Sequence, residues 1–381
     1  MVDKKRREEN KLKSEIKKGM KKVPPGMIIS VNYDLGSEKW ISTYRVYDGS
    51  LHEGVGATEN LSRLIAMLKA AVYAEDGYQT IIPEIEDREK KYLRWKNDLR
   101  YILDQQTRVI DYLIHILSGN DIGSDVDIEK IKTNSNVIMP LLLMIQAVGV
   151  SEHSIYQLSS YTSMNIRDCY SIGRSILETC VNICLLHTLG IDAVNRAERH
   201  ALQKYFRDLD RKVHLTNVKV NLKSELASKI DPSTVPGLND AIKEFSKKDG
   251  SEVRDWIDMS IDKKIDIVAE SHPIHLGTTL AAARMALYRH SSEILHGTLF
   301  GVRYFFAPNI FVKGPASSRE EMIENLYEHF LSCFTAIYFS IDVMIEILSV
   351  EYGLSGVRER RSALLGRLLK LEFIKDAEKA E

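Results

Sequence analysis

The sequence predicts an all-α protein, a multi-helix bundle preceded by a small N-terminal β element. From about residue 83 onward apolar residues recur every three or four positions, which is the period of an amphipathic helix. Residues 27–35 and 39–51 alternate apolar and polar side chains as strands do, and no further strand is predicted. The 381 residues, 44% of them hydrophobic and 28% charged, are enough to bury a sizeable core.

The N-terminal part divides into an arm and a small α/β element. Residues 1–26 form the arm, and ten Lys and Arg stand against four acids in its first 22 positions. Such an arm is typically a solvated helix, and the alternative is contact with a phosphate backbone. Residues 27–82 hold the two strands and a helix of about 58–74, for which Thr58 is the expected N-cap.

Residues 83–381 form the predicted helical domain. Pro83 opens a long helix that ends near Ser118. A polar, linker-like stretch, 119–136, follows and has room for one short helix. Ser318 and Glu321 have the spacing of a capping box. The expected helices beyond the linker span 137–149, 151–162, 164–189, 191–213, 237–247, 251–270, 277–299, 318–352 and 357–378.

Charge and motifs exclude several classes of protein. The net charge of −1 means that any basic surface must be local. The four cysteines have no zinc-site spacing, and the phosphate-loop, hydrolase-elbow and HExxH motifs are absent, so no metal and no cofactor are expected. The apolar runs 137–150 and 330–341 are shorter than the roughly 20 residues of a membrane span. Together with a charged N-terminus, they favour a cytoplasmic protein that does not enter membranes.

A polar stripe crosses the apolar helix expected at 164–189. Arg174, Glu178 and Asn182 are spaced i, i+4 and i+8, so they share one face. A charge pair among apolar neighbours is expected to be partly buried. The stripe is either an ion pair that fixes helix packing or one wall of a polar pocket, in which Arg174 would bind a phosphate or carboxylate.

The second candidate site is Tyr288–Gly297, the segment YRHSSEILHG. Arg289, Glu293 and His296 fall on one helical face, with Tyr288 and Ser292 beside them. Arginine and a histidine that titrates near neutral pH can cleave a phosphodiester without a metal ion. A glycine after the histidine would allow a close backbone approach. The alternative is a histidine hydrogen-bonded within a helix interface, beside a surface Arg–Glu pair.

Both segments resemble a family of mainly bacterial helical proteins of unassigned chemistry. The likeness covers roughly residues 85–350. More distantly, Arg289-His290-x5-His296 resembles the motif of the HEPN superfamily, small helical domains many of which are metal-independent ribonucleases of toxin and antiviral systems. That resemblance implies a HEPN-like core, a homodimer, and catalysis by Arg289 and His296 with Glu293 or His290 in support. The same Arg–His spacing recurs at Arg207/His214 and elsewhere in this chain.

Two functions are therefore expected from the sequence. The first is a metal-independent endoribonuclease acting as a toxin or an antiphage-defence effector. In this hypothesis Arg174, Glu178, Asn182, Tyr288 and Ser292 bind the substrate. The second is a non-catalytic module that binds RNA or a nucleotide, or that serves as a scaffold for a protein partner.

Overall fold

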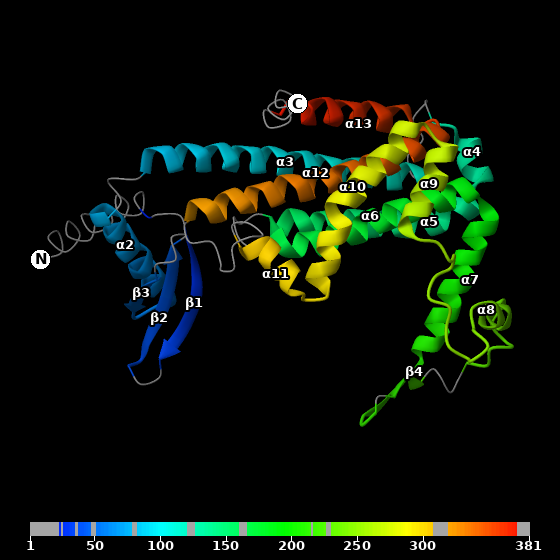
Figure 1. The fold of residues 1–381 in the computed structure, drawn as a ribbon, viewed down its shortest axis with the longest axis horizontal. Helices are drawn as coiled ribbons and strands as arrows, with labels where there is room; N and C mark the ends of the chain where they lie inside the picture. The colour runs from blue at the N-terminus through cyan, green and yellow to red at the C-terminus, as the bar shows by residue number, and fades with distance from the viewer. Residues whose placement is uncertain are drawn as a thin grey trace, which may run out of the picture. The chain divides into compact units, whose positions relative to one another are not determined.

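The computed structural model describes most of the chain (Figure 1). The described residues are 23, 26–34, 37–46, 51–77, 82–119, 126–159, 166–214, 216–225, 230–307 and 319–371. They contain twelve α-helices and five short strands, so the predicted all-α fold with a small N-terminal β element is confirmed. Nearly all of the predicted basic arm lies outside the described residues.

The chain divides into two compact units. Unit 1 comprises Met1–Arg94 and Phe306–Asn325, and unit 2 comprises Trp95–Phe305 and Leu326–Glu381. The division falls inside helix α3 (Ile82–Leu117), the helix with which the predicted helical domain begins.

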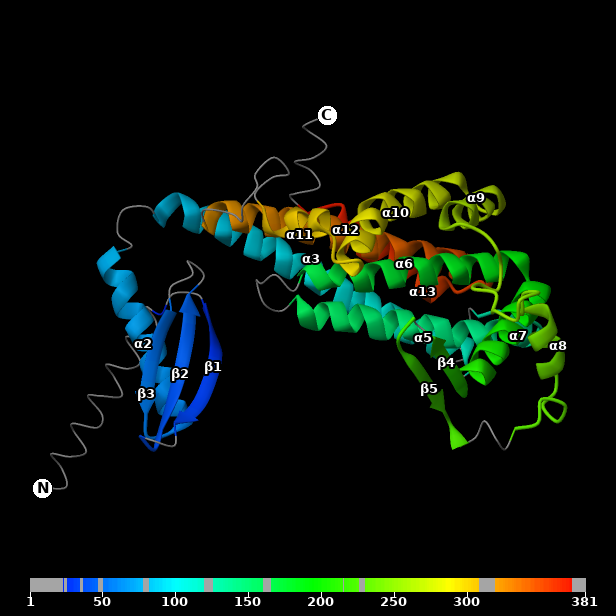
Figure 2. The same cartoon turned by 60° about the horizontal axis from the view of Figure 1, so that its bottom comes forward.

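Unit 1 contains a three-stranded antiparallel sheet with a helix on one face (Figure 2). The central strand β2 (Lys39–Val46) pairs with β1 (Gly26–Asp34) and with β3 (Leu51–Gly56). Helix α2 (Glu59–Gly77) packs on the sheet. Alternation along β2 places Tyr44 and Val46 in a core with Ala66 and Ala70.

The prediction of one strand over 39–51 is wrong, because two strands occupy this part of the chain. β2 ends at Val46, and β3 begins at Leu51 and runs antiparallel to it. The Asp48–Gly49 pair between them is a common hairpin-turn sequence. That pair is the signal that identifies the third strand.

Unit 2 is built from helices and one short hairpin. Its elements after α3 are α4 (Ile128–Thr133), α5 (Ser135–Leu158), α6 (Ile166–Leu189), α7 (Ile191–Asp208), β4 (Asp210–His214), β5 (Lys219–Lys223), α8 (Leu238–Glu244), α9 (Ile261–Ser271), α10 (Ile274–Leu295), α11 (Leu299–Phe306), α12 (Arg319–Glu351) and α13 (Ser355–Leu368). The short helix α4 lies within the predicted linker, as expected.

Helix α6 is the centre of unit 2 and packs against α5, α7, α9 and α10. Half of its residues are buried, among them Leu177, Cys180 and Cys184. All four cysteines of the chain are free and buried, so they pack as small apolar side chains. At Gly173 a Cβ atom would lie 3.0 Å from the side chain of Ile337, so glycine allows α12 to approach α6 closely.

Two predicted helix boundaries are wrong for identifiable reasons. Helices 137–149 and 151–162 form a single helix, α5, since Gly149 serves close packing and does not end the helix. A Cβ at Gly149 would lie 3.3 Å from Cγ2 of Ile110. The helix expected at 251–270 begins only at Ile261, where the Ser260 hydroxyl accepts a hydrogen bond from the Lys263 amide as its N-cap.

Two other predicted helices each contain a second element. The helix expected at 191–213 ends at Asp208, and the chain continues into the β4–β5 hairpin. The alternation of apolar and polar residues in 218–223 is the signal for β5. The helix expected at 277–299 is α10, which ends at Leu295, and α11 follows it.

The basic C-terminal helix α13 is anchored by a buried arginine. Arg361 donates two hydrogen bonds to the Asp342 carboxylate, at 2.9 and 2.7 Å, and a third to Glu346. Both acids belong to α12, so the fork of Arg361 binds α13 to that helix. The predicted helix 357–378 ends at Leu368, and its residues 372–378 lie outside the described residues.

Two described helices are long and apolar enough to cross a membrane, by length and composition alone. They are α5 and the Asn325–Glu351 part of α12. In the latter, 78% of the most apolar window is buried inside the protein, against 44% in α5. Packing within the protein accounts for the composition of α12 and for the inner face of α5.

Gly54 tests the packing of unit 1. A Cβ at this position would lie 2.0 Å from the Ser62 carbonyl oxygen, so Gly54→Ala must push α2 away from β3. We expect the free energy of unfolding to fall by about 2–3 kcal/mol, as measured by calorimetry.

Gly366→Ala in α13 is the matched control. No atom lies within 4 Å of its added Cβ, so the same change should stabilise the helix by up to about 1 kcal/mol. Equal effects at the two positions would contradict the close α2–β3 contact.

Candidate functional site

The polar stripe of α6 begins with a partly buried ion pair, as its spacing predicts. Nε of Arg174 donates to Oε1 of Glu178 at 2.8 Å. Their side chains are 21% and 39% exposed. The pair therefore keeps partial access to solvent at the boundary of the core.

The ring of Tyr288 on α10 receives two guanidinium groups. That of Arg174 lies 4.0 Å from the ring centroid and that of Arg284 lies 5.3 Å from it. Arg284 in turn pairs with Asp262 of α9, with a 2.8 Å distance from Nε to Oδ1. Cation–π contacts of this kind contribute on the order of 1 kcal/mol each, so Tyr288 links the three helices.

Asn182 ends the stripe and holds a buried lysine. Its Oδ1 accepts a hydrogen bond from Nζ of Lys264 on α9 at 3.0 Å, and Lys264 is only 7% exposed. All three residues of the stripe thus have partners on α6, α9 or α10. The structure brings the stripe to Tyr288, but Arg289 and His296 lie on another face of α10.

Arg289 and His296 lie together on the outer face of α10. Both are exposed, and neither makes an ion pair with a described residue. The Arg289 guanidinium lies 5.3 Å from the ring centroid of Phe300 on α11. Ser292 lies between them and is half-buried. Its hydroxyl is not one of the buried side-chain groups that lack a hydrogen-bond partner among the described residues.

The expected helix 277–299 places His296 inside a helix, which is wrong, because His296 is the C-cap of α10. Gly297 has φ +61°, its amide donates to the Ile294 carbonyl at 3.0 Å, and the Thr298 amide donates to the Glu293 carbonyl at 3.1 Å. These bonds form a Schellman motif. A Cβ at Gly297 would meet no atom within 4 Å. The left-handed backbone of the turn therefore explains why this residue is glycine. The predicted close backbone approach to the histidine does not explain it, because no atom lies near this position.

Glu293 is engaged by this turn. Its carboxylate accepts a hydrogen bond from the Thr298 hydroxyl, and that hydroxyl accepts one from the Gly301 amide at 3.1 Å. The backbone of Glu293 also lies against Gly301, where a Cβ would be 2.6 Å from the Glu293 carbonyl oxygen. Glu293 thereby fixes the direction in which α11 leaves the turn that carries His296.

His290 lies in an aromatic stack. Its ring is parallel to that of Tyr304, with 3.8 Å between the centroids. Phe300 lies beside this stacked pair with its ring nearly parallel, 6.2 Å from the centroid of Tyr304 and 6.5 Å from that of His290. Nδ1 of His290 is buried and has no hydrogen-bond partner among the described residues. Burial, and then the charge of Arg289, lowers the pKa of His290 below its ordinary value.

His329 of α12 lies behind this stack and was not predicted. Its Nε2–H donates to the Tyr304 carbonyl at 2.8 Å, and its Nδ1 lies 3.5 Å from the Tyr170 hydroxyl. Since a carbonyl can only accept, Nε2 must carry the proton of the neutral ring. The sequence signal for His329 is a single histidine on the apolar face of a helix, which is common in ordinary cores.

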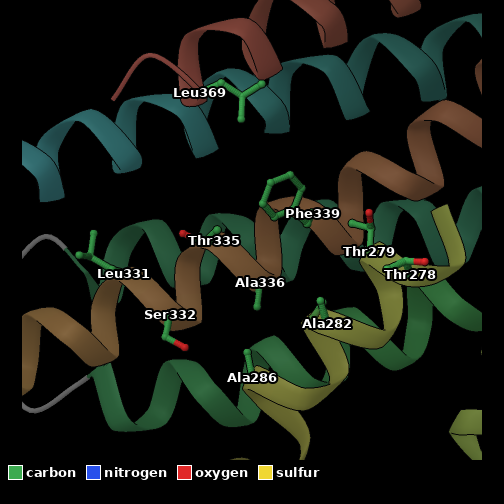
Figure 3. A pocket seen from close by; sticks show the side chains of 11 residues that line it. Thr278, Thr279, Ala282, Ala286, Leu331, Ser332, Thr335, Ala336, Phe339 and Leu369 are labelled. Carbon is green, nitrogen blue, oxygen red and sulfur yellow. The ribbon is translucent and has the colours of Figure 1, made fainter. Parts of the chain in front are cut away.

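An apolar groove of about 610 Å³ runs between α10 and α12 (Figure 3). None of the predicted site residues lines it, and its described walls carry no charged side chain. The lining residues that Figure 3 labels are Thr278, Thr279, Ala282, Ala286, Leu331, Ser332, Thr335, Ala336, Phe339 and Leu369. The groove lacks the charge that a phosphate-binding site requires.

His329 makes stability depend on pH. Burial lowers its pKa to about 4, whereas the unfolded chain binds this proton below about pH 6.5. The folded protein should therefore lose stability as the pH falls from 6.5 toward 4, by about 2 kcal/mol at pH 5. His329→Gln keeps a donor for the Tyr304 carbonyl but does not titrate. Urea unfolding at pH 7 and pH 5 should show that the wild type loses more stability than this variant, and parallel losses would contradict the assignment.

Comparison with known proteins identifies no relative. No family model matches the chain, and no curated protein and no solved structure matches it. The resemblances of residues 167–186 and 288–297 stay predictions, and the function must be inferred from the residues themselves.

Proposed function

We propose that the protein is a HEPN-like, metal-independent endoribonuclease whose site is the outer face of α10. One observation carries the proposal. Arg289 and His296 are exposed on the same face, and neither is held by an ion pair with a described residue. Exposed charged side chains are solvated and need no partner in the protein, so both groups are free to contact a substrate.

The chemistry follows from the two residue types. Arg289 and His296 are seven residues apart, which corresponds to about 10 Å along a helix. The long side chain of Arg289 can span part of this distance. In the proposed reaction the 2′-hydroxyl of RNA attacks phosphorus and the 5′-oxygen leaves, which gives a 2′,3′-cyclic phosphate. His296 moves a proton from the attacking hydroxyl to the leaving oxygen. Arg289 stabilises the charge that builds on the phosphoryl oxygens.

The aromatic rings beside Arg289 support RNA as the substrate. Phe300 is 37% exposed and lies beside the stacked rings of Tyr304 and His290, nearly parallel to both. Nucleobases of single strands stack on such rings, with about 1–3 kcal/mol per base. A base on Phe300 would place its phosphate near the guanidinium that already lies over that ring.

Exposed apolar side chains surround the turn between α10 and α11. Leu295, Leu299 and Val302 are 61%, 65% and 46% exposed. Apolar residues grouped in this way favour a protein partner, and a second copy of the chain is the occupant that we propose, consistent with action as a toxin or defence effector. They equally suit the alternative function, a non-catalytic module that binds RNA or a nucleotide and holds a partner protein.

His296→Ala tests the proposal directly. We expect RNA cleavage, and toxicity in a host cell, to fall at least about 100-fold, while the helical circular dichroism stays unchanged because His296 is exposed at a helix end. The assay follows the loss of a labelled single-stranded RNA and the appearance of a cyclic phosphate end.

His275→Ala is the matched control, since His275 is also exposed on α10 but lies at its first turn. It should cleave at the wild-type rate. Full activity of His296→Ala would remove the catalytic assignment, and RNA binding without any cleavage by the wild type would establish the alternative.

A further inference from the structure

The β4–β5 hairpin extends from the end of α7 as a two-stranded ribbon (Figure 2). Every described residue of Thr216–Lys223 is exposed. A two-stranded ribbon is only marginally stable by itself, and its rows of unpaired backbone groups and exposed side chains are available to a partner.

The ribbon and the end of α7 that carries it are basic. Residues 204–223 hold six Lys and Arg against two acids, in a chain whose net charge is −1. Two of the six have close carboxylates, Arg211 near Asp208 at 3.2 Å and Lys212 near Asp210 at 3.5 Å. Lys219 and Lys223 make no ion pair with a described residue, so their charges are available to a ligand.

The strand register gives the ribbon two different faces. Lys212 lies opposite Asn221, and Lys223 opposite Asp210, so these residues share one face with Lys219. Arg211 lies opposite Leu222 on the other face. The first face, the lysine face, therefore presents Lys212, Lys219 and Lys223 in a row along about 13 Å of strand.

The base of the ribbon is held by the rest of the unit through Arg207, at the end of α7. Arg207 donates to the Ser246 hydroxyl and to the Gly250 carbonyl, each at 2.9 Å. These acceptors are neutral, so the charge of Arg207 is not cancelled by them. A groove of about 530 Å³ lies at the base of the ribbon and is lined from both of its faces, by Arg207, Asp210, Arg211, Lys212, Val220, Leu222 and Glu252. The anchor fixes the base of the ribbon, while Lys219 and Lys223 lie outside the groove and are exposed.

We propose that the lysine face of the β4–β5 ribbon binds the phosphate backbone of single-stranded RNA, at a site separate from Arg289 and His296. The choice of RNA rests on the proposed function, and the choice of a polyanion rests on charge. A row of flexible, exposed ammonium groups matches a chain of phosphates without requiring a particular base. An acidic protein partner is the competing outcome that the experiment distinguishes.

The test measures binding apart from cleavage. In a His296→Ala background, which keeps the RNA intact, fluorescence anisotropy gives the affinity for a labelled single-stranded RNA at several salt concentrations. Lys219→Gln/Lys223→Gln should weaken binding about tenfold and lower the salt slope by about 1.4, the value expected for the loss of two phosphate contacts on a single strand. Lys219→Arg/Lys223→Arg keeps the charge and should bind normally.

The matched control is Lys263→Gln/Lys370→Gln, which removes the same charge from exposed lysines on α9 and beyond α13. It should bind as the parent does. If the ribbon variant binds RNA as tightly as this control, or if the parent binds no RNA, the ribbon proposal is overturned. A different result would contradict the proposed ribonuclease activity. In that case RNA would bind through the ribbon, but the protein with His296 intact would not cleave it.

Discussion

The burial of α6 is the constraint on which the helical unit depends. Helices pack on it from several sides, so the polar residues of its exposed seam must find partners within the protein. Arg174 finds Glu178 and the ring of Tyr288, and Asn182 finds the buried ammonium of Lys264. These contacts favour the observed faces of α9 and α10, since rotation of α9 would leave the buried Lys264 without Asn182 and rotation of α10 would remove the Tyr288 ring from Arg174.

This packing decides what α10 can present to solvent. One face of the helix is occupied by Leu287, Tyr288 and Ser291 in the core or against α6. The opposite face, with Arg289 and His296, is therefore turned outward. The Schellman turn at Gly297 then makes His296 the C-cap of α10 and folds α11 back, so that Phe300 and Tyr304 lie beside Arg289 and His290.

The fold class and most helices could be predicted because burial of one face imposes a period on the sequence. The role of Gly149 could not be predicted from this period. A glycine that ends a helix and a glycine that allows a neighbouring side chain such as Ile110 to pack closely look the same in sequence. For the site, helical spacing correctly placed Arg174 with Glu178 and Arg289 with His296. It could not place Tyr304 and His329 beside His290, because these residues lie on three different helices and the turn that brings the helices together has no helical period.

Net charge constrains how such a protein could hold RNA. With a total of −1, the molecule as a whole does not attract a polyanion, so affinity must come from cations gathered on one surface. A single exposed arginine beside His296 supplies one phosphate contact, too few for tight non-specific binding. In the proposal the ribbon lysines supply the others, and their position away from His296 separates affinity from chemistry. Loss of the ribbon charges would then raise KM while leaving kcat unchanged, whereas loss of His296 would lower kcat alone.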